Sequence, residues 1–333
     1  MLSGVRKPTR SREVGRGEKV LPGIWRLRLP LPWPGVPHCN AWALAAGSGV
    51  VLVDTGMHEP GSMMHLHRAL DQARLRIEHV RLVVCTHAHV DHCGEAPTIA
   101  DRAGCEVWMH PNYALHAAAT ADPEQALARR VEIARQSGVP EAQIQRLIEQ
   151  RRGQGSGQAG VLKADRELTE GDTVETDLGT WQVIETPGHA PSHICLYQPE
   201  RRLLISGDHV LGRVSLYFDA GYTPDPVGEF LASLDKVEQL DARLALSGHG
   251  RPFTDVPGHV AANRALVAER LDAVRAALPG TAYEVAQAIY GDALTDATAA
   301  WLLSKTRCYL IHLERLGVAE SGGQSPERWS IAA

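Results

Sequence analysis

The most constraining feature of the chain is a run of metal-ligating side chains at residues 86–92. The run reads THAHVDH, and it places three imidazoles and a carboxylate within six residues, from His87 to His92. It follows the apolar stretch 82–85, so we expect it to begin where a buried strand ends. Imidazole nitrogen and carboxylate oxygen suit zinc, iron or manganese. A loop that is merely rich in histidine is the alternative, and the ligand-type residues downstream argue against it.

Three of those downstream residues follow predicted strands, each after a glycine. His189 lies in TPGH after the strand 181–186, Asp208 lies in SGDH after 203–206, and His249 lies in SGHG after 244–247. Ligands at the ends of adjacent strands converge on one edge of a sheet, and glycine permits close backbone approach. The repeated pattern therefore predicts one metal centre assembled from distant segments.

Apolar β-branched runs alternate with amphipathic helical patterns over much of the chain. Strands are predicted at 41–46, 49–55, 82–86, 106–110, 181–186, 194–198, 203–206 and 244–247, and helices at 62–74 and 227–239. Strands interleaved with helices predict a layered α/β domain.

Two stretches depart from this alternation. Residues 111–160 predict helices at 123–137 and 141–152 and end in a glycine-rich segment, which is typical of an insertion. We interpret the insertion as a lid over a pocket, and the alternative is an excursion without function. The segment 258–333 predicts helices at 260–278, 282–290 and 297–316 and a hairpin formed by 318–320 and 329–332, which indicates a winged-helix-like domain.

The charge balance argues against a nucleic-acid or membrane-surface protein. The formal net charge is −5, and the segment from 258 onward carries seven basic and eight acidic residues, without the footprint of a phosphate binder. We therefore expect this domain to act as a cap or to form a homodimer contact. No apolar run approaches the roughly 18–20 residues that cross a bilayer.

Six cysteines without a CxxC pair indicate reduced thiols in a cytoplasmic protein. The first twenty residues are rich in arginine and lysine and have no apolar core, so we interpret 1–20 as a flexible basic tail. The predicted organisation is thus a tail at 1–20, a catalytic domain at 21–257 and the small domain at 258–333.

The motifs THAHVDH (86–92), TPGH (186–189), SGDH (206–209) and SGHG (247–250), with Asp54 in VDTG, resemble those of the metallo-β-lactamase superfamily. The resemblance is strongest to the glyoxalase II-like hydrolase branch and covers roughly residues 21–256. It implies a four-layer αβ/βα sandwich with the site along one edge of two facing sheets. A C-terminal helical or winged-helix extension also recurs in that branch.

The resemblance implies two divalent metal ions, with zinc favoured and iron or manganese as alternatives. It assigns the first ion to His87, His89 and His189, the second to Asp91, His92 and His249, and the bridging position to Asp208. Such a site lowers the pKa of bound water towards about 7, and a second ion about 3.5–4 Å away holds the substrate oxygen or the leaving group. Asp54 is expected to orient a ligand or the turn backbone.

The function implied is hydrolysis of a thioester, ester or lactone of a small molecule by a hydroxide that bridges the metals. The predicted catalytic residues are Asp91, Asp208 and Tyr217. Tyr217 is included because a phenol soon after Asp208 can donate to the carbonyl or the leaving group. Two alternatives stay open: a metal-dependent endoribonuclease or phosphodiesterase, and an iron-dependent protein resembling persulfide dioxygenases. The secreted β-lactamases often carry cysteine where Asp208 stands, so antibiotic hydrolysis is not expected.

Several other polar residues are weaker candidates for a role in the site. We expect Cys93 to pack in the core and His209 to pack or to lie behind the ligands, and we rank a site role and a structural role for His193 equally. Arg213 and the insertion arginines 129, 130, 151 and 152 are candidates for binding an anionic substrate tail, although solvated surface charge is the preferred interpretation for the insertion.

Overall fold

Two mixed sheets face each other in the computed structural model, which describes residues 14–33, 35–153, 155–213 and 215–333. The first sheet has the order β1 (Arg16–Leu21), β2 (Ile24–Pro30), β3 (His38–Ala46), β4 (Gly49–Val53), β5 (Val80–Val84), β6 (Glu106–Met109) and β7 (Arg166–Glu167). The second has the order β12 (Leu244–Ser247), β11 (Leu203–Gly207), β10 (Ile194–Gln198), β9 (Gly179–Glu185) and β8 (Thr173–Thr176). Strands β4 to β7 run parallel, as do β11 and β12, so the carboxyl ends of these strands lie at common edges.

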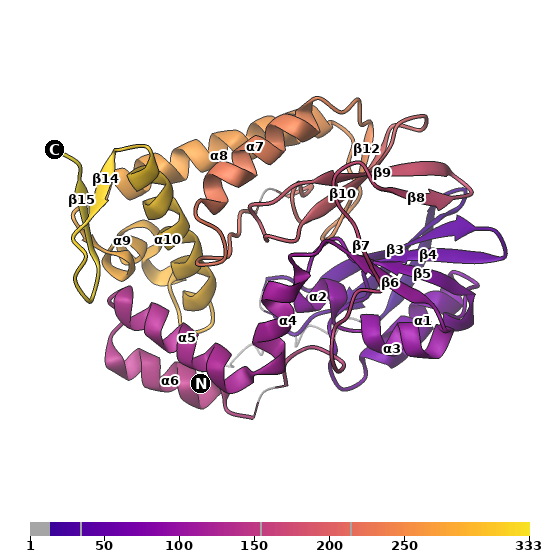
Figure 1. Ribbon diagram of the computed structural model, residues 1–333, viewed down its shortest axis with the longest axis horizontal. Helices are drawn as coiled ribbons and strands as arrows, with labels where there is room; N and C mark the ends of the chain where they lie inside the picture. The colour runs from indigo at the N-terminus through magenta and orange to yellow at the C-terminus, as the bar shows by residue number, and fades with distance from the viewer. Residues whose placement is uncertain (1–13, 34, 154, 214) are drawn as a thin grey trace, which may run out of the picture.

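Helices cover the outer face of each sheet (Figure 1). Helices α1 (Ser62–Gln72) and α3 (Ala96–Ala103) pack on the first sheet, and α7 (Pro226–Glu238) and α8 (Val256–Ala276) lie on the side of the second. The buried side chains between the sheets include Trp42, Trp181 and Ile205, because alternate strand residues point into this layer. The predicted four-layer αβ/βα sandwich is confirmed.

The amino terminus is more ordered than the sequence indicates. Arg16–Leu21 forms β1 and pairs antiparallel with β2, so the flexible tail predicted for 1–20 is wrong for its last five residues. The charged side chains of β1 sit on a half-exposed edge strand, where polar residues are tolerated and the apolar alternation is weak. Residues 1–13, which carry most of the predicted tail, lie outside the described residues.

The insertion contains three helices: α4 (Tyr113–Ala121), α5 (Pro123–Gln136) and α6 (Glu141–Arg151). Helices α5 and α6 match the prediction, and α5 begins where the Asp122 carboxylate accepts a hydrogen bond from the Gln125 N–H at 2.9 Å. Helix α4 was not predicted, because its alanine-rich sequence has no apolar stripe and none of its residues is buried.

The C-terminal segment contains α9 (Ala282–Tyr290), α10 (Ala299–Arg315) and a small sheet of β13 (Gly280–Thr281), β15 (Arg328–Ile331) and β14 (Ala319–Ser321). The predicted hairpin is present as β14 and β15, whereas β13 is too short for a pattern to reveal. Tyr309 of α10 packs edge-on against Phe218 at 5.7 Å and belongs to the same buried cluster as Phe230 of α7. This segment therefore shares a core with the layer beneath the second sheet.

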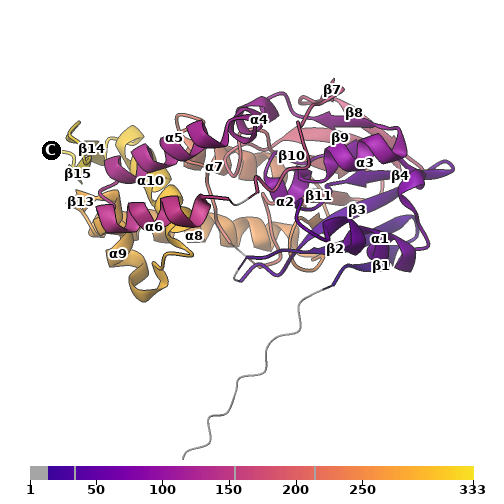
Figure 2. The same ribbon diagram turned by 90° about the horizontal axis from the view of Figure 1, so that it is seen from below.

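The insertion is anchored to the C-terminal segment, and both views place α5 and α6 beside α10 and α9 (Figure 2). The Tyr283 N–H donates to the Ser137 carbonyl at 2.9 Å, and the Gln143 side chain donates to the Tyr283 hydroxyl at 2.6 Å. Arg146 and Asp296 form an ion pair at 2.9 Å. These contacts anchor the insertion to the C-terminal segment.

No helix within the described ranges combines the length and the apolar character that a bilayer crossing requires.

Candidate metal centre

Seven side chains predicted as metal ligands meet at one edge of the sandwich. Four come from the loop and short helix α2 (Val90–Cys93) after β5, and three come from the turns after β9, β11 and β12. These residues are His87, His89, Asp91, His92, His189, Asp208 and His249. The two sheets therefore contribute ligand-type atoms to a single cluster.

Three imidazoles form the first group. The Nδ1 atom of His89 lies 3.0 Å from Nε2 of His87 and 3.0 Å from Nε2 of His189. Burial and the neighbouring histidines lower the pKa of His87, and burial is the main cause that lowers the pKa of His189 to about 4. Both imidazoles are therefore neutral at pH 7, which is the form that binds a metal ion.

Asp91, His92 and His249 form the second group. Asp91 Oδ2 lies 3.4 Å from His92 Nε2 and 3.3 Å from His249 Nε2. Asp208 lies 3.1 Å from His249 Nε2, 3.5 Å from His92 Nε2 and 3.8 Å from His189 Nε2. Asp208 thus stands between the two groups, facing imidazoles of both.

The donor set fits divalent metal ions. His92 Nε2 and Asp208 Oδ1 are buried and have no hydrogen-bond partner among the described residues. An unsatisfied buried polar group costs about 1–3 kcal/mol, and a bound cation removes that cost. A side chain at Gly248 would fill the same space, since its Cβ would lie 2.7 Å from His92 Cε1 and closer still to Asp208 Oδ1.

A hydrogen bond from the opposite ring nitrogen orients most of these imidazoles. His92 Nδ1 lies 2.8 Å from Asp54 Oδ2, His189 Nδ1 lies 3.1 Å from the Tyr217 carbonyl, and His249 Nδ1 lies 2.9 Å from the His38 carbonyl. With Nδ1 as the donor, Nε2 of each ring is left free to bind a metal. The expectation that Asp54 orients a ligand agrees with this geometry.

Asp54 has an unusual backbone conformation that places it at this position. Its φ of 64° is left-handed, a region that aspartate and asparagine enter more readily than most residues. Its Oδ1 accepts a hydrogen bond from the Thr86 N–H at 2.8 Å, and the Thr86 hydroxyl donates to both carboxylate oxygens. One carboxylate therefore links the ends of β4 and β5 to His92.

Two residues near the cluster, Asp219 and His116, were missed by the sequence reasoning. Asp219 Oδ2 lies 2.7 Å from His89 Nε2 and 3.0 Å from Nε2 of His116, which belongs to α4 of the insertion. The charged and hydrogen-bonding imidazoles lower the pKa of Asp219 in spite of its burial. Neither residue follows a recognisable motif, so no sequence signal identifies them.

Tyr217 lies beside the cluster, but its hydroxyl is already engaged. Its ring centroid is 5.8 Å from that of His89 and 5.7 Å from that of His189, and its hydroxyl donates to Asp219 Oδ1 at 2.8 Å. Burial and the Asp219 charge raise the pKa of Tyr217. This geometry favours a positioning role over the predicted donation to substrate.

The weaker candidates occupy supporting positions. His193 Nε2 accepts a hydrogen bond from the Asp208 N–H at 3.0 Å, so this residue fixes the turn that carries Asp208. His209 is buried against Phe230, with ring centroids 4.8 Å apart. Cys93 is buried in the core beneath the first sheet, as expected.

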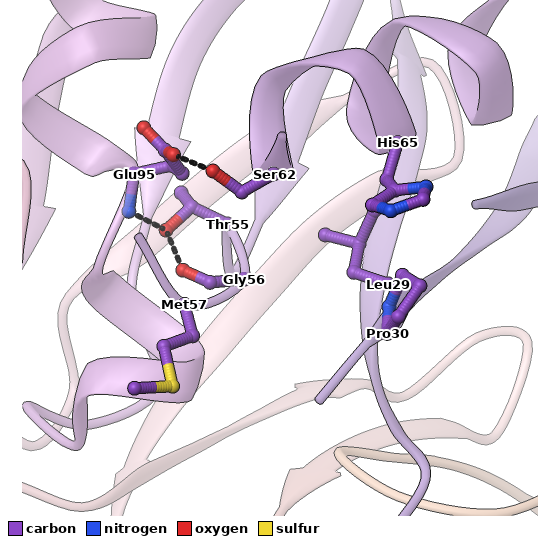
Figure 3. A pocket seen from close by; sticks show the side chains of 8 residues that line it. All are labelled: Leu29, Pro30, Thr55, Gly56, Met57, Ser62, His65 and Glu95. Carbon is purple, nitrogen blue, oxygen red and sulfur yellow. Dashed lines mark hydrogen bonds between the residues drawn. The ribbon is translucent and has the colours of Figure 1, made fainter. Parts of the chain in front are cut away.

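A small pocket is lined by residues of β2, the loop after β4, helix α1 and Glu95 (Figure 3). Glu95 lines it and is hydrogen-bonded to Ser62, while the Thr55 hydroxyl accepts from the Glu95 N–H at 3.2 Å and donates to the His92 carbonyl at 2.9 Å. These hydrogen bonds connect the lining of the pocket to the turn that carries His92.

Comparisons with solved structures agree with this fold over nearly the whole chain. A metallo-beta-lactamase family protein from Thermus thermophilus superposes with a TM-score of 0.81 at 27% identity, covering 94% of this chain and 100% of that chain. A beta-lactamase domain protein from Burkholderia ambifaria gives a TM-score of 0.82 at 28% identity, covering 95% and 94%. The similarity therefore includes the C-terminal segment.

Curated relatives and a family model point in the same direction. A Bacillus subtilis protein named "Probable metallo-hydrolase YqjP" is 27% identical over 81% of this chain and 86% of its own length. The thioesterase pkgB of Emericella nidulans is 25% identical over 67% of this chain and 48% of its own length. The model of the Metallo-beta-lactamase superfamily matches residues 34–249, more than half of the chain and every ligand-type residue of the cluster. With its fold, its cluster and this match in agreement, the chain belongs to the metallo-beta-lactamase superfamily of metal-binding hydrolases.

Proposed function

We propose that the protein is a dinuclear metal-dependent hydrolase of a thioester, ester or lactone in a small molecule. The observation that carries the proposal is the position of Asp208, whose carboxylate lies within 3.1–3.8 Å of imidazoles from both ligand groups. A carboxylate so placed can bridge two cations and reduce their mutual repulsion. The related thioesterase pkgB supports the thioester as the first substrate class to test.

The proposed ligands follow the two groups. His87, His89 and His189 would hold one ion, Asp91, His92 and His249 the other, and Asp208 would touch both. Zinc is our first choice, and iron and manganese suit the same mixed donors. When bound, two such ions activate water and polarise a carbonyl group.

The protein's own groups would orient the reaction. Asp54 and Asp219 fix the tautomers of His92 and His89, so each ring presents an unprotonated nitrogen to the cluster. We assign to Asp91 the acceptance of the proton from the attacking water, because its carboxylate reaches the cluster at His92 and His249. Water adds to the carbonyl carbon, the bond to sulfur or oxygen breaks, and the proton leaves with the thiol or alcohol.

The finer assignments are the ones that the sequence motifs and composition predict. We place the chain in the glyoxalase II-like branch, with a winged-helix-like C-terminal domain, and expect a cytoplasmic protein. The hairpin after the helices α8 to α10 supports the winged-helix assignment. A homodimer through this domain stays a prediction.

The direct test is a substrate panel on metal-loaded protein. Thioesters, esters and lactones should be hydrolysed, a phosphodiester should not, and no oxygen should be consumed with a persulfide. The Asp208→Ala variant should lose turnover together with bound metal. Full activity in that variant contradicts the two-metal proposal, and activity confined to the phosphodiester or persulfide replaces it with one of the alternatives.

A further inference from the structure

The segment that leads from the insertion back to the first sheet contacts the end of the short ligand helix α2. Within residues 155–160 the side chain of Gln158 is buried, with only 7% of the residue exposed. Its amide NH₂ group donates to the Cys93 carbonyl at 3.1 Å and to the Gly94 carbonyl at 3.5 Å. The Ala159 N–H donates to the same Gly94 carbonyl at 2.8 Å. The exit of the insertion is therefore hydrogen-bonded to the carboxyl end of α2.

These hydrogen bonds bear on the metal centre because α2 carries Asp91 and His92. Carbonyl groups at the carboxyl end of a helix have no partner within the helix, and leaving a buried polar group without a partner is costly. Gln158 supplies donors to two such carbonyls. It thus favours the position of α2 in which both ligand side chains face the cluster.

The two segments approach so closely that glycine is required on both sides of the contact. A Cβ at Gly94 would lie 2.5 Å from the Gly157 carbonyl oxygen and 2.7 Å from the His58 nitrogen. A Cβ at Gly157 would lie 2.9 Å from Met57 Cε and 3.1 Å from Val90 Cγ2, and the φ of Gly157 is 78°. The His58 N–H also donates to the Gly157 carbonyl at 2.9 Å. The segment is thus packed against α2 by its backbone as well as by Gln158.

The insertion reaches the other end of the ligand run 86–92 through helix α4. His116 Nε2 lies 3.0 Å from Asp219 Oδ2, and the same oxygen lies 2.7 Å from His89 Nε2. The His116 ring stacks on Tyr222 with centroids 4.6 Å apart, and its centroid is 5.3 Å from that of His89. His116 is therefore placed to hold Asp219 against a predicted metal ligand.

We propose that Gln158 and His116 are positioning residues through which the insertion fixes both ends of the ligand run. Gln158 acts on the ion assigned to the α2 ligands, and His116 acts through Asp219 on the ion assigned to His89. The proposal rests on the two-ion centre of the proposed function and is independent of the substrate. Because coupling between two sites is reciprocal, each bound ion stabilises the insertion contact at its own end.

The variant Q158M tests the α2 end, because methionine keeps the length of the side chain and removes the amide group. It should weaken binding of the ion at the α2 ligands about tenfold, the lower end of the range for residues that orient metal ligands, since Gln158 acts through the backbone. The ion at the three-histidine group should keep its wild-type affinity. The matched control is Q145M, because Gln145 is exposed on α6, where its side chain donates to Glu141 at 2.7 Å.

The variants H116F and H116Q test the other end. Phenylalanine keeps an aromatic ring against Tyr222 and removes the donor to Asp219, whereas glutamine keeps a donor. H116F should weaken the ion at the three-histidine group about tenfold and leave the other ion unchanged, and H116Q should recover most of the lost affinity. The control is H67F, because the contact of His67 with Arg102 Nη1 at 3.4 Å is exposed on α1.

Two measurements that do not depend on turnover read these effects. Chelator competition gives the affinity of each ion, and NMR of cobalt(II)-loaded protein assigns it to a site through the shifted N–H signals of the bound imidazoles. Hydrogen exchange of metal-free and loaded protein tests the reciprocal effect. Loading should slow exchange at the Ala159 amide and in α4. Q158M should abolish the slowing at Ala159 alone, and H116F should abolish the slowing in α4 alone.

Wild-type affinity for both ions in either variant would overturn the proposal for that end. Equal loss of both ions would overturn it as well, because a general loss of stability does not select one site. If circular dichroism shows that Q158M does not fold, exchange at Ala159 in the wild type decides the α2 end, and no slowing on loading overturns it. If two ions bind but no ester or thioester is hydrolysed, the proposed function fails while the affinities still decide the positioning roles. A wild-type protein that binds no ion overturns both.

Discussion

Asparagine at position 54 should disable one metal position and spare the other. In the native protein Asp54 Oδ2 faces His92 Nδ1 at 2.8 Å, while Oδ1 accepts from the Thr86 N–H at 2.8 Å. An asparagine amide has one acceptor and one donor. When its oxygen keeps the Thr86 contact, its NH₂ group faces His92 Nδ1 and forces the ring proton onto Nε2, the atom that points to the cluster.

The expected loss of metal affinity follows from these contacts. Loss of a carboxylate that orients a histidine ligand typically weakens metal binding 10–100-fold, which is about 1.4–2.7 kcal/mol. The variant D54N should therefore bind the His92 ion 10–100-fold more weakly and retain the ion at His87, His89 and His189. Asparagine is suitable because it tolerates the left-handed φ of 64° at this position.

Chelator competition with each ion, combined with metal counting by mass spectrometry, measures this effect. The control is D177N, because Asp177 is an exposed carboxylate that also accepts a backbone hydrogen bond, from the Gly47 N–H at 2.8 Å, away from the cluster. Two ions bound with wild-type affinity in D54N would refute the role assigned to Asp54.

Three further predictions concern other parts of the molecule. The variant D219N should weaken binding at the His89 position about 10–100-fold and leave the other position unchanged, as read by the same chelator competition; a loss at both positions would contradict a role through His89 alone. The variant G248A should lose bound metal with its circular dichroism spectrum intact, whereas G155A, which meets no atom within 4 Å, should keep its metal; a G248A protein with two ions would show that the turn has room for a side chain. Burial lowers the pKa of Lys305 to about 8 from 10.5, so the unfolded chain binds more protons between these values and the native free energy of unfolding rises with pH across that window. The variant K305M should therefore raise stability at pH 7 in denaturant titrations, by at most about 3 kcal/mol, because each pKa unit corresponds to about 1.4 kcal/mol and the variant also loses the Lys305 hydrogen bond to the Leu216 carbonyl. This gain should shrink towards pH 10, and a gain that does not depend on pH would contradict the assigned cause.

The sequence predicts the parts of the site that follow local patterns. A buried strand followed by glycine and a ligand-type residue is a short-range signal, and it placed His189, Asp208 and His249 correctly at the strand ends. Helix α9 matched its predicted bounds, because a capping box at Thr281 and Glu284 marks its start. In each case the neighbouring residues in the sequence were sufficient to predict the position of the ligand or the helix end.

The rest depends on contacts between distant segments. Asp219 approaches His89 across 130 positions of sequence, and His116 reaches it from a helix without an apolar stripe. The anchoring of the insertion on Tyr283 likewise spans 140 positions. Periodicity and composition do not encode contacts between distant segments. The residues that orient the ligands from outside the motifs could therefore be identified only from the structure.

The central claim is that one cluster holds two ions that share Asp208. Anomalous scattering from crystals of metal-loaded protein tests it most directly. We expect two peaks about 3.5–4 Å apart, one bounded by His87, His89 and His189 and the other by Asp91, His92 and His249, with Asp208 touching both. A single peak at full metal loading, or two peaks with Asp208 on only one of them, would contradict it.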